Sequence, residues 1–213
     1  MRSLSVPARP GAVAPMRMVW LPGAYHSHEE FLTAGFAQAA RARLADIDLI
    51  FADLHMDFIG DRRLLNRLRC EFVLPARRAG VSVWMGGISL GGLFALDYTD
   101  SHPGELAGLC LLAPYLGNRM LTGEIAAGPG LAGWEPGQLA QGDVERRIWR
   151  YLQNRPADSE ALYLGYGRDD RFAPAHELMA ATLPPACVDV VGGGHEWSTW
   201  LRLWENFLDS RTP

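Results

Sequence analysis

Apolar residues along this chain gather into short runs that are separated by longer segments of mixed polarity. The runs lie near Val19 and at 47–51, 81–85, 106–113, 162–166 and 188–191. The intervening segments have lengths and patterns that suit helices, and strands that alternate with helices are typical of a parallel sheet covered on both faces. The pattern therefore predicts an α/β protein with a doubly wound, mostly parallel sheet of about six strands.

The chain is expected to form one domain. It has 213 residues, of which 48% are hydrophobic, which suffices for one well-filled core but not for two enzymatic domains. Residues 1–15 hold three prolines and no sustained strand pattern, so we expect a flexible N-terminal arm there. The domain itself is expected to span residues 16–213.

The segment Gly87-Ile88-Ser89-Leu90-Gly91 carries the clearest chemical signal. An apolar run at 81–85 leads into it and a helix-compatible run at 93–96 leaves it, which predicts a strand, a sharp turn and a helix. Such a turn lifts the Ser89 hydroxyl out of the sheet, and the helix aims its first N–H groups at developing negative charge. We therefore interpret Ser89 as a nucleophile. The alternative is a tight turn of the kind that is common in doubly wound sheets.

A serine hydroxyl needs a base, and His195 is the candidate. It follows the apolar run 188–191 and three glycines, and it precedes the helix-compatible segment 197–208. His195 is therefore expected in a loop beyond the carboxyl end of a strand, at the edge where parallel sheets hold their sites. The alternative is an ordinary surface histidine in a glycine-rich loop.

An aspartate that orients the histidine is expected in the loop after the apolar run 161–166, where Asp169 and Asp170 lie. Pro174 suits the first turn of the next helix and leaves Asp170 within the loop, which favours Asp170 over Asp169. The alternative, which must hold for at least one of the two aspartates, is a solvated turn residue next to Arg168 and Arg171.

From about Met16 to Phe207 the chain resembles the α/β-hydrolase family, whose members carry nucleophile, acid and histidine in the order found here: Ser89, Asp170, His195. The resemblance implies a catalytic triad in a compact, esterase-like serine hydrolase. The family's usual first two strands have no counterpart in the apolar pattern, so we expect them to be shortened or absent.

The resemblance also implies an oxyanion hole built from two backbone N–H groups. One belongs to the residue after the nucleophile, Leu90, and the other comes from the loop after the strand-like run 18–21. Ala24 is the first candidate for this second donor, and Tyr25 is the next. Many members have His-Gly in this loop, where this chain has Pro22-Gly23. Because the donor is a backbone group, the change affects the shape of the loop more than its chemistry.

Residues 115–155 lie where α/β-hydrolases insert lids. The segment is rich in glycine and proline at first and is helix-compatible from 143 to 153. We predict a small lid-like insertion with Trp134 at an acyl pocket, and the alternative is an inert crossover connection. A lid of this size favours a small or medium substrate.

Four polar residues have spacings that also occur in metal sites: His26, His28, His55 and Asp57. Residues two apart in a loop often point in different directions, and no Cys-x-x-Cys or His-Glu-x-x-His pattern accompanies them. We therefore expect no metal and no cofactor. Tyr25 and His55 are interpreted instead as contacts to a polar group of the substrate.

Charge and composition narrow the possible partners. A net charge of −4 and a pI of about 5.9 give no electrostatic basis for binding nucleic acid. No stretch has the length and apolarity of a membrane span or a secretion signal. Three cysteines far apart in the chain, Cys70, Cys110 and Cys187, are typical of reduced thiols in a cytoplasmic protein.

The expected function is that of a serine hydrolase that cleaves a carboxylic ester, or a thioester or amide, of a small or medium molecule through an acyl-enzyme. Two alternatives stay open. One is a non-catalytic protein that uses the same fold to bind a ligand. The other is an acyltransferase in which the same triad passes the acyl group to an alcohol.

Overall fold

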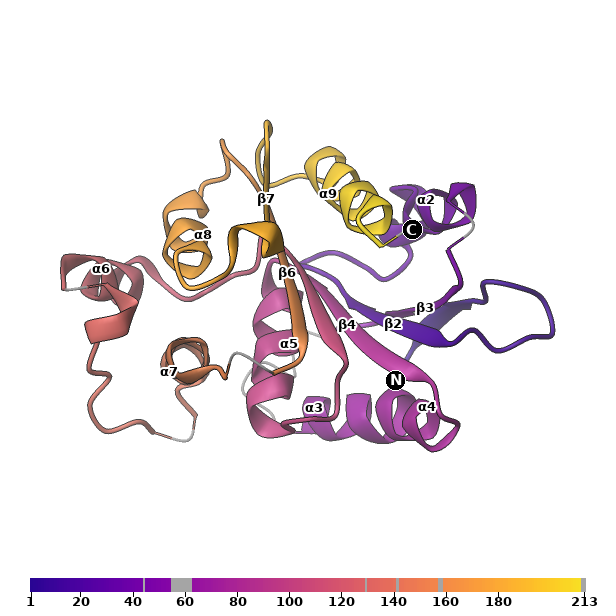
Figure 1. Ribbon diagram of the computed structural model, residues 1–213, viewed down its shortest axis with the longest axis horizontal. Coiled ribbons are helices and arrows are strands. Elements are labelled where there is room, and N and C mark those ends of the chain that lie inside the picture. Colours follow the sequence, from indigo (N-terminus) through magenta and orange to yellow (C-terminus); the bar gives the residue numbers. More distant parts are fainter. Residues whose placement is uncertain (44, 55–62, 129, 141, 157–158, 212–213) are drawn as a thin grey trace.

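The computed structural model describes residues 1–211 except 44, 55–62, 129, 141 and 157–158. Its centre is a seven-stranded sheet in the order β1-β3-β2-β4-β5-β6-β7 (Figure 1). The strands are β1 (Ser3–Val6), β2 (Met16–Leu21), β3 (Ile47–Ala52), β4 (Ser82–Ile88), β5 (Gly108–Leu112), β6 (Ala161–Gly167) and β7 (Val188–Val191). All neighbouring strands are parallel except β1 and β3. The predicted doubly wound α/β fold is thus confirmed.

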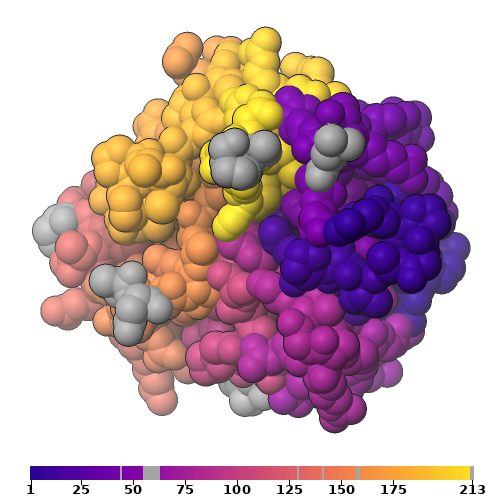
Figure 2. Space-filling model, turned by 45° about the vertical axis from the view of Figure 1, so that its right-hand side comes forward, coloured from indigo at the N-terminus to yellow at the C-terminus, as the bar shows by residue number. Residues whose placement is uncertain are grey.

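The sheet has one strand that the sequence pattern did not predict. Ser3–Val6, within the expected flexible arm, pairs antiparallel with β3, with Leu4 opposite Phe51. After this strand, the Asp48 carboxylate accepts hydrogen bonds from the N–H groups of Ala8 at 3.0 Å and Ala14 at 3.3 Å. In Figure 2 the arm, in indigo, lies against the purple segment that follows it. The expectation of a loose arm was therefore wrong, because four alternating residues before a proline give too short a pattern.

Helices flank the sheet on both faces. They are α1 (Glu30–Thr33), α2 (Phe36–Ala42), α3 (Arg63–Leu68), α4 (Leu74–Arg78), α5 (Leu90–Ser101), α6 (Arg119–Ala127), α7 (Val144–Asn154), α8 (Ala173–Ala180) and α9 (Trp197–Asp209), with short π or 3₁₀ turns at Arg69–Val73, Leu131–Gly133 and Pro185–Cys187. Figure 1 shows α2 and α9 on one face of the sheet and α3, α4 and α5 on the other. In the described part of the chain, no helix is both long and apolar enough to cross a bilayer.

Aromatic side chains join α9 to the sheet and to α2. The Trp20 ring of β2 is fully buried and lies edge-on to Trp204, with ring centroids 5.1 Å apart. The Trp204 indole N–H donates to the Phe36 carbonyl at 3.0 Å. Trp200 and Trp204 share the buried face of α9, as their helical spacing predicts. This packing fixes α9 on the sheet, and the helix begins at Trp197, two residues after His195.

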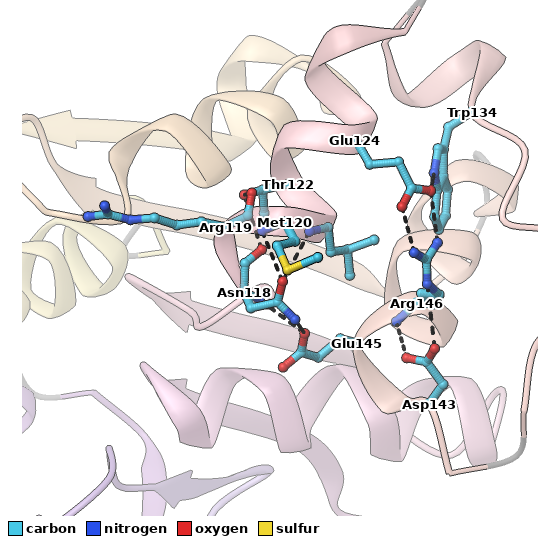
Figure 3. Close-up of polar contacts among 10 residues, drawn as sticks. Asn118, Arg119, Met120, Thr122, Glu124, Trp134, Asp143, Glu145 and Arg146 are labelled. Atoms are coloured by element: carbon cyan, nitrogen blue, oxygen red, sulfur yellow. Dashed lines mark hydrogen bonds and ion pairs between the residues drawn. The ribbon is translucent and has the colours of Figure 1, made fainter.

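The segment 115–155 contains α6 and α7, which are tied to each other and to α5. Figure 3 shows the Glu124 carboxylate of α6 between Trp134 and Arg146, accepting from the Trp134 indole at 2.9 Å and from the Arg146 guanidinium at 2.8 Å. On the other side of α7, Arg147 donates to Asp97 of α5 at 2.8 Å. A largely buried ion pair of this kind orients α7 on the domain.

Candidate active site

Ser89 lies at the apex of the turn between β4 and α5. Its backbone has φ 51° and ψ −116°, a conformation that side-chain-bearing residues rarely adopt. The turn also needs its two flanking glycines: a Cβ on Gly87 would lie 2.4 Å from the Gly91 carbonyl oxygen, and a Cβ on Gly91 would lie 2.2 Å from the Leu21 carbonyl oxygen. The sequence Gly-x-Ser-x-Gly thus gives a tight turn with the serine at its tip.

Backbone hydrogen bonds hold Ser89 in this conformation. Its N–H donates to the Leu112 carbonyl at 3.1 Å, and its carbonyl accepts from Gly92 at 2.9 Å and from Tyr115 at 2.8 Å. These partners come from β5, from α5 and from the loop after β5. The serine is therefore fixed from three directions, which compensates for the strain of its positive φ.

His195 and Asp170 form a hydrogen-bonded pair. The distance from His195 Nδ1 to Asp170 Oδ2 is 2.7 Å, and the Asp170 side chain is fully buried. The other carboxylate oxygen, Oδ1, accepts the Phe172 N–H at 2.8 Å. Burial favours the neutral acid, but the hydrogen bonds from His195 and Phe172 outweigh it, so the pKa of Asp170 lies below its usual value. An ionised Asp170 accepts a hydrogen bond from His195 Nδ1–H, which in the neutral ring leaves Nε2 with its lone pair.

The neighbouring Asp169 has a different set of contacts. Its N–H donates to the Gly193 carbonyl at 3.0 Å, and its Oδ2 accepts the Gly193 N–H at 3.2 Å. Asp169 therefore links the loop after β6 to the loop after β7, and it is Asp170 that contacts the histidine.

Ser89 and His195 open onto one cavity of about 390 Å³. It is lined by Ala24, Tyr25, His26, Ser89, Asp169, Arg171 and His195. The loop after β2 thus lies beside the serine. The loop turns sharply there, since the His26 N–H donates to the Gly23 carbonyl at 3.2 Å and Tyr25 has φ 64°.

Two predicted oxyanion donors have suitable positions. Leu90 is the first residue of α5, and the first N–H groups of a helix have no carbonyl partner within that helix. Ala24 lines the cavity next to Ser89. Tyr25 also lines the cavity, and 91% of this residue is exposed to solvent.

Of the other predicted substrate contacts, Trp134 is not brought to the cavity. Trp134 is only 6% exposed, and its indole is bound to Glu124 within the segment that contains α6 and α7. It is not among the residues that line the serine cavity, because its aromatic ring fills the core of that segment instead. His55 and Asp57 lie outside the described residues. His28 is buried beside Asp53 and is not among the residues that line the serine cavity.

A second buried histidine lies behind the acid loop. His176 of α8 has an exposed fraction of 0%, and its Nε2 donates to the Pro114 carbonyl at 2.9 Å. Burial lowers the pKa of His176 to about 4, against the opposing effect of the Asp170 charge. It had no sequence signal, because a histidine inside a helical pattern does not show which face is buried.

A larger apolar groove of about 770 Å³ adjoins the serine cavity. Arg171 lines both spaces. The groove runs between α6 and α8, with its walls formed mainly by Tyr115, Thr122, Gly123, Ala126, Phe172, Pro174, Ala175, Leu178 and Ala181. An apolar chain attached to a group at Ser89 would find room there.

Comparison with known proteins finds similarity in structure rather than in sequence. No family model matches the chain, and no curated protein matches it. Among solved structures, Est1E from Butyrivibrio proteoclasticus is 16% identical and has a TM-score of 0.66, over 98% of this chain and 91% of that one. A ferulic acid esterase is 15% identical with a TM-score of 0.65, over 96% and 87% of the two chains.

A monoacylglycerol lipase from Paleococcus ferrophilus matches 98% of this chain and 98% of its own, at 13% identity and a TM-score of 0.63. Identities this low show the fold alone. The chain has the α/β-hydrolase fold, with Ser89, Asp170 and His195 at the carboxyl edge of its sheet.

Proposed function

We propose that this protein is a serine hydrolase that cleaves carboxylic esters of small or medium molecules through an acyl-enzyme. One observation carries the proposal: Ser89, at a strained turn, shares a cavity with His195, whose Nδ1 is bound to the buried Asp170 carboxylate. The fold of the solved esterases and lipases supports it. The same chemistry extends to thioesters and amides.

The mechanism follows from the roles that this geometry allows. His195 Nε2 takes the Ser89 proton while the serine oxygen attacks the carbonyl carbon, and Asp170 stabilises the resulting imidazolium. The N–H groups of Leu90 and Ala24 donate to the carbonyl oxygen as it becomes negative. His195 then returns the proton to the leaving alcohol, which departs and leaves the acyl group on Ser89. Water, activated by the same histidine, releases the acid.

The test is covalent labelling with a fluorophosphonate, followed by intact-mass measurement. The wild-type protein is expected to gain one adduct and Ser89→Ala none, whereas Ser159→Ala, changed before β6 at the far end of the sheet, should label normally. Hydrolysis of a series of p-nitrophenyl esters should disappear in Ser89→Ala and persist in Ser159→Ala. A folded wild-type protein that takes no label would contradict the proposal and favour a non-catalytic ligand-binding protein.

A further inference from the structure

His26 is a polar side chain at the serine cavity to which the proposed mechanism gives no role. Its Nδ1 lies 2.8 Å from Glu30 Oε2. Glu30 is held in turn, because its Oε1 accepts the Ser27 N–H at 2.9 Å and its Oε2 accepts the Trp197 indole N–H at 3.2 Å. Burial raises the pKa of Glu30, but the hydrogen bonds from Ser27 and His26 outweigh it and the pKa lies below its usual value.

The imidazole ring is also fixed by aromatic contacts. Trp197 and Trp200 both lie edge-on to it, with ring centroids at 5.2 and 5.7 Å. The Cδ2 edge of His26 faces Gly23: a Cβ on that glycine would lie 3.2 Å from His26 Cδ2 and 3.4 Å from Ser89 Cβ. The ring is therefore close to the proposed nucleophile and has one orientation.

This arrangement defines what His26 offers to a ligand. An ionised Glu30 accepts a hydrogen bond from Nδ1–H, so the neutral ring has a lone pair on Nε2. About a third of the side chain, 32%, is exposed, which leaves Nε2 as the polar atom available to the cavity. A lone pair there accepts a hydrogen bond, and the natural donor on an uncharged substrate is a hydroxyl group.

The position of the ring indicates which part of an ester it meets. His26 and His195 both line the cavity and both contact the Trp200 ring, with ring centroids at 5.7 Å from His26 and 5.0 Å from His195, so one indole joins the two imidazoles. His195 protonates the oxygen of the departing alcohol. The apolar groove that begins at Arg171 suits the acyl chain instead. The alcohol part of the ester is thus the part nearest to His26.

We propose that His26, oriented by Glu30, binds a second hydroxyl group on the alcohol part of the substrate, so that the preferred substrates are esters of diols or polyols. The inference depends on the proposed function of Ser89. The same contact would favour alcohols with a second hydroxyl as acceptors of the acyl group, when an alcohol instead of water attacks the acyl-enzyme. The acceptor oxygen then attacks the acyl carbon, its proton passes to His195 Nε2 and then to the Ser89 oxygen, and the new ester leaves.

Transfer of the acyl group to an added alcohol tests the contact between His26 and a second hydroxyl separately from the acylation of Ser89. The enzyme is supplied with p-nitrophenyl butyrate and with equal concentrations of ethane-1,2-diol or 2-methoxyethanol, which are similar in size but differ in the second hydroxyl. The measured quantity is the amount of butyryl ester formed for each acceptor relative to free butyrate. Release of p-nitrophenol reports the acylation of Ser89 separately.

We expect the wild-type enzyme to favour the diol, and His26→Phe to reduce that preference by about 3- to 10-fold, which corresponds to the loss of one hydrogen bond. Glu30→Gln should reduce it as well, because the imidazole loses its ionised acceptor. His102→Phe makes the same change after the last residue of α5, outside the residues that line the serine cavity, and should keep the preference. Fluorophosphonate labelling of Ser89 in each variant verifies that the site is folded.

Equal yields from the two acceptors in the wild-type enzyme, including no transfer to either, would overturn the inference. So would a preference that survives in both His26→Phe and Glu30→Gln, or one that disappears in His102→Phe. A wild-type protein that neither labels nor releases p-nitrophenol would instead contradict the proposed function itself.

Discussion

Replacing His176 should reduce the loss of stability that the protein undergoes between neutral and mildly acidic pH. Burial lowers the pKa of His176 from its usual 6.5 to about 4. Between these two values the unfolded chain binds a proton that the folded chain does not, so the free energy of unfolding falls as the pH falls. At about 1.36 kcal/mol for each pKa unit, the full contribution of this residue is ~3 kcal/mol.

The assay is urea unfolding followed by tryptophan fluorescence, for the wild-type protein, His176→Gln and His176→Phe. At pH 7 both variants should be less stable than the wild type, because the bond from Nε2 to the Pro114 carbonyl is lost or distorted. When the pH is lowered to about 4.5, the difference in free energy of unfolding between the wild-type protein and each variant should narrow by ~2.5 kcal/mol, because neither variant has a titrating group at position 176.

The two variants serve as controls for each other. Glutamine and phenylalanine differ in size and polarity, so their stabilities at pH 7 will differ, but their pH dependence should be the same. If the wild-type protein and both variants instead lose stability in parallel as the pH falls, the lowered pKa of His176 is refuted.

Three further experiments, which use five substitutions, test other parts of the site. Asp170→Asn should lower kcat for ester hydrolysis by about 10⁴-fold by favouring the wrong imidazole tautomer, and Asp169→Asn should have a much milder effect; the reverse order would reassign the acid. Gly91→Ala places a Cβ 2.2 Å from a backbone oxygen and should lower the free energy of urea unfolding by ~3 kcal/mol, whereas Gly123→Ala, inside α6 with no atom nearby, should raise it by ~1 kcal/mol. Ala126→Phe should narrow the groove between α6 and α8, lowering kcat/KM for octanoyl p-nitrophenyl ester by about 10-fold but not for the acetyl ester; equal effects on both esters would exclude the groove as an acyl site.

The sequence predicted those parts of the site that depend on short local patterns. Ser89 lies between an apolar run and a helix-compatible run, and the glycines around it are required by contacts within a few ångströms. The loop positions of Asp170 and His195 follow from strands that run in parallel, whose carboxyl ends meet at one edge. Asp170 and His195 can meet because the strands before them, β6 and β7, are parallel neighbours. The alternation of strands and helices in the sequence already predicts such a parallel arrangement.

Other features depend on packing between segments that are far apart in the chain. Strand β1 exists because β3 offers it an edge, and its four residues alone carry too little pattern to predict it. Trp134 was assigned to the acyl pocket from its place in a glycine-rich segment, but its partner Glu124 lies in a helix ten residues earlier. The role of His26 depends on Trp197 and Trp200, which come from the other end of the chain.

The reciprocal hydrogen bonds between Asp169 and Gly193 have a mechanical consequence. They join the acid loop and the histidine loop, which carry Asp170 and His195, into one hydrogen-bonded unit. Ser89 belongs to a second unit, formed by β4, α5 and the loop after β5. The hydrogen bond from His176 to Pro114 crosses directly between them, next to the residue whose N–H holds the Ser89 carbonyl. A buried hydrogen bond from α8, the helix that follows the acid loop, thus couples the position of Asp170 to that of Ser89.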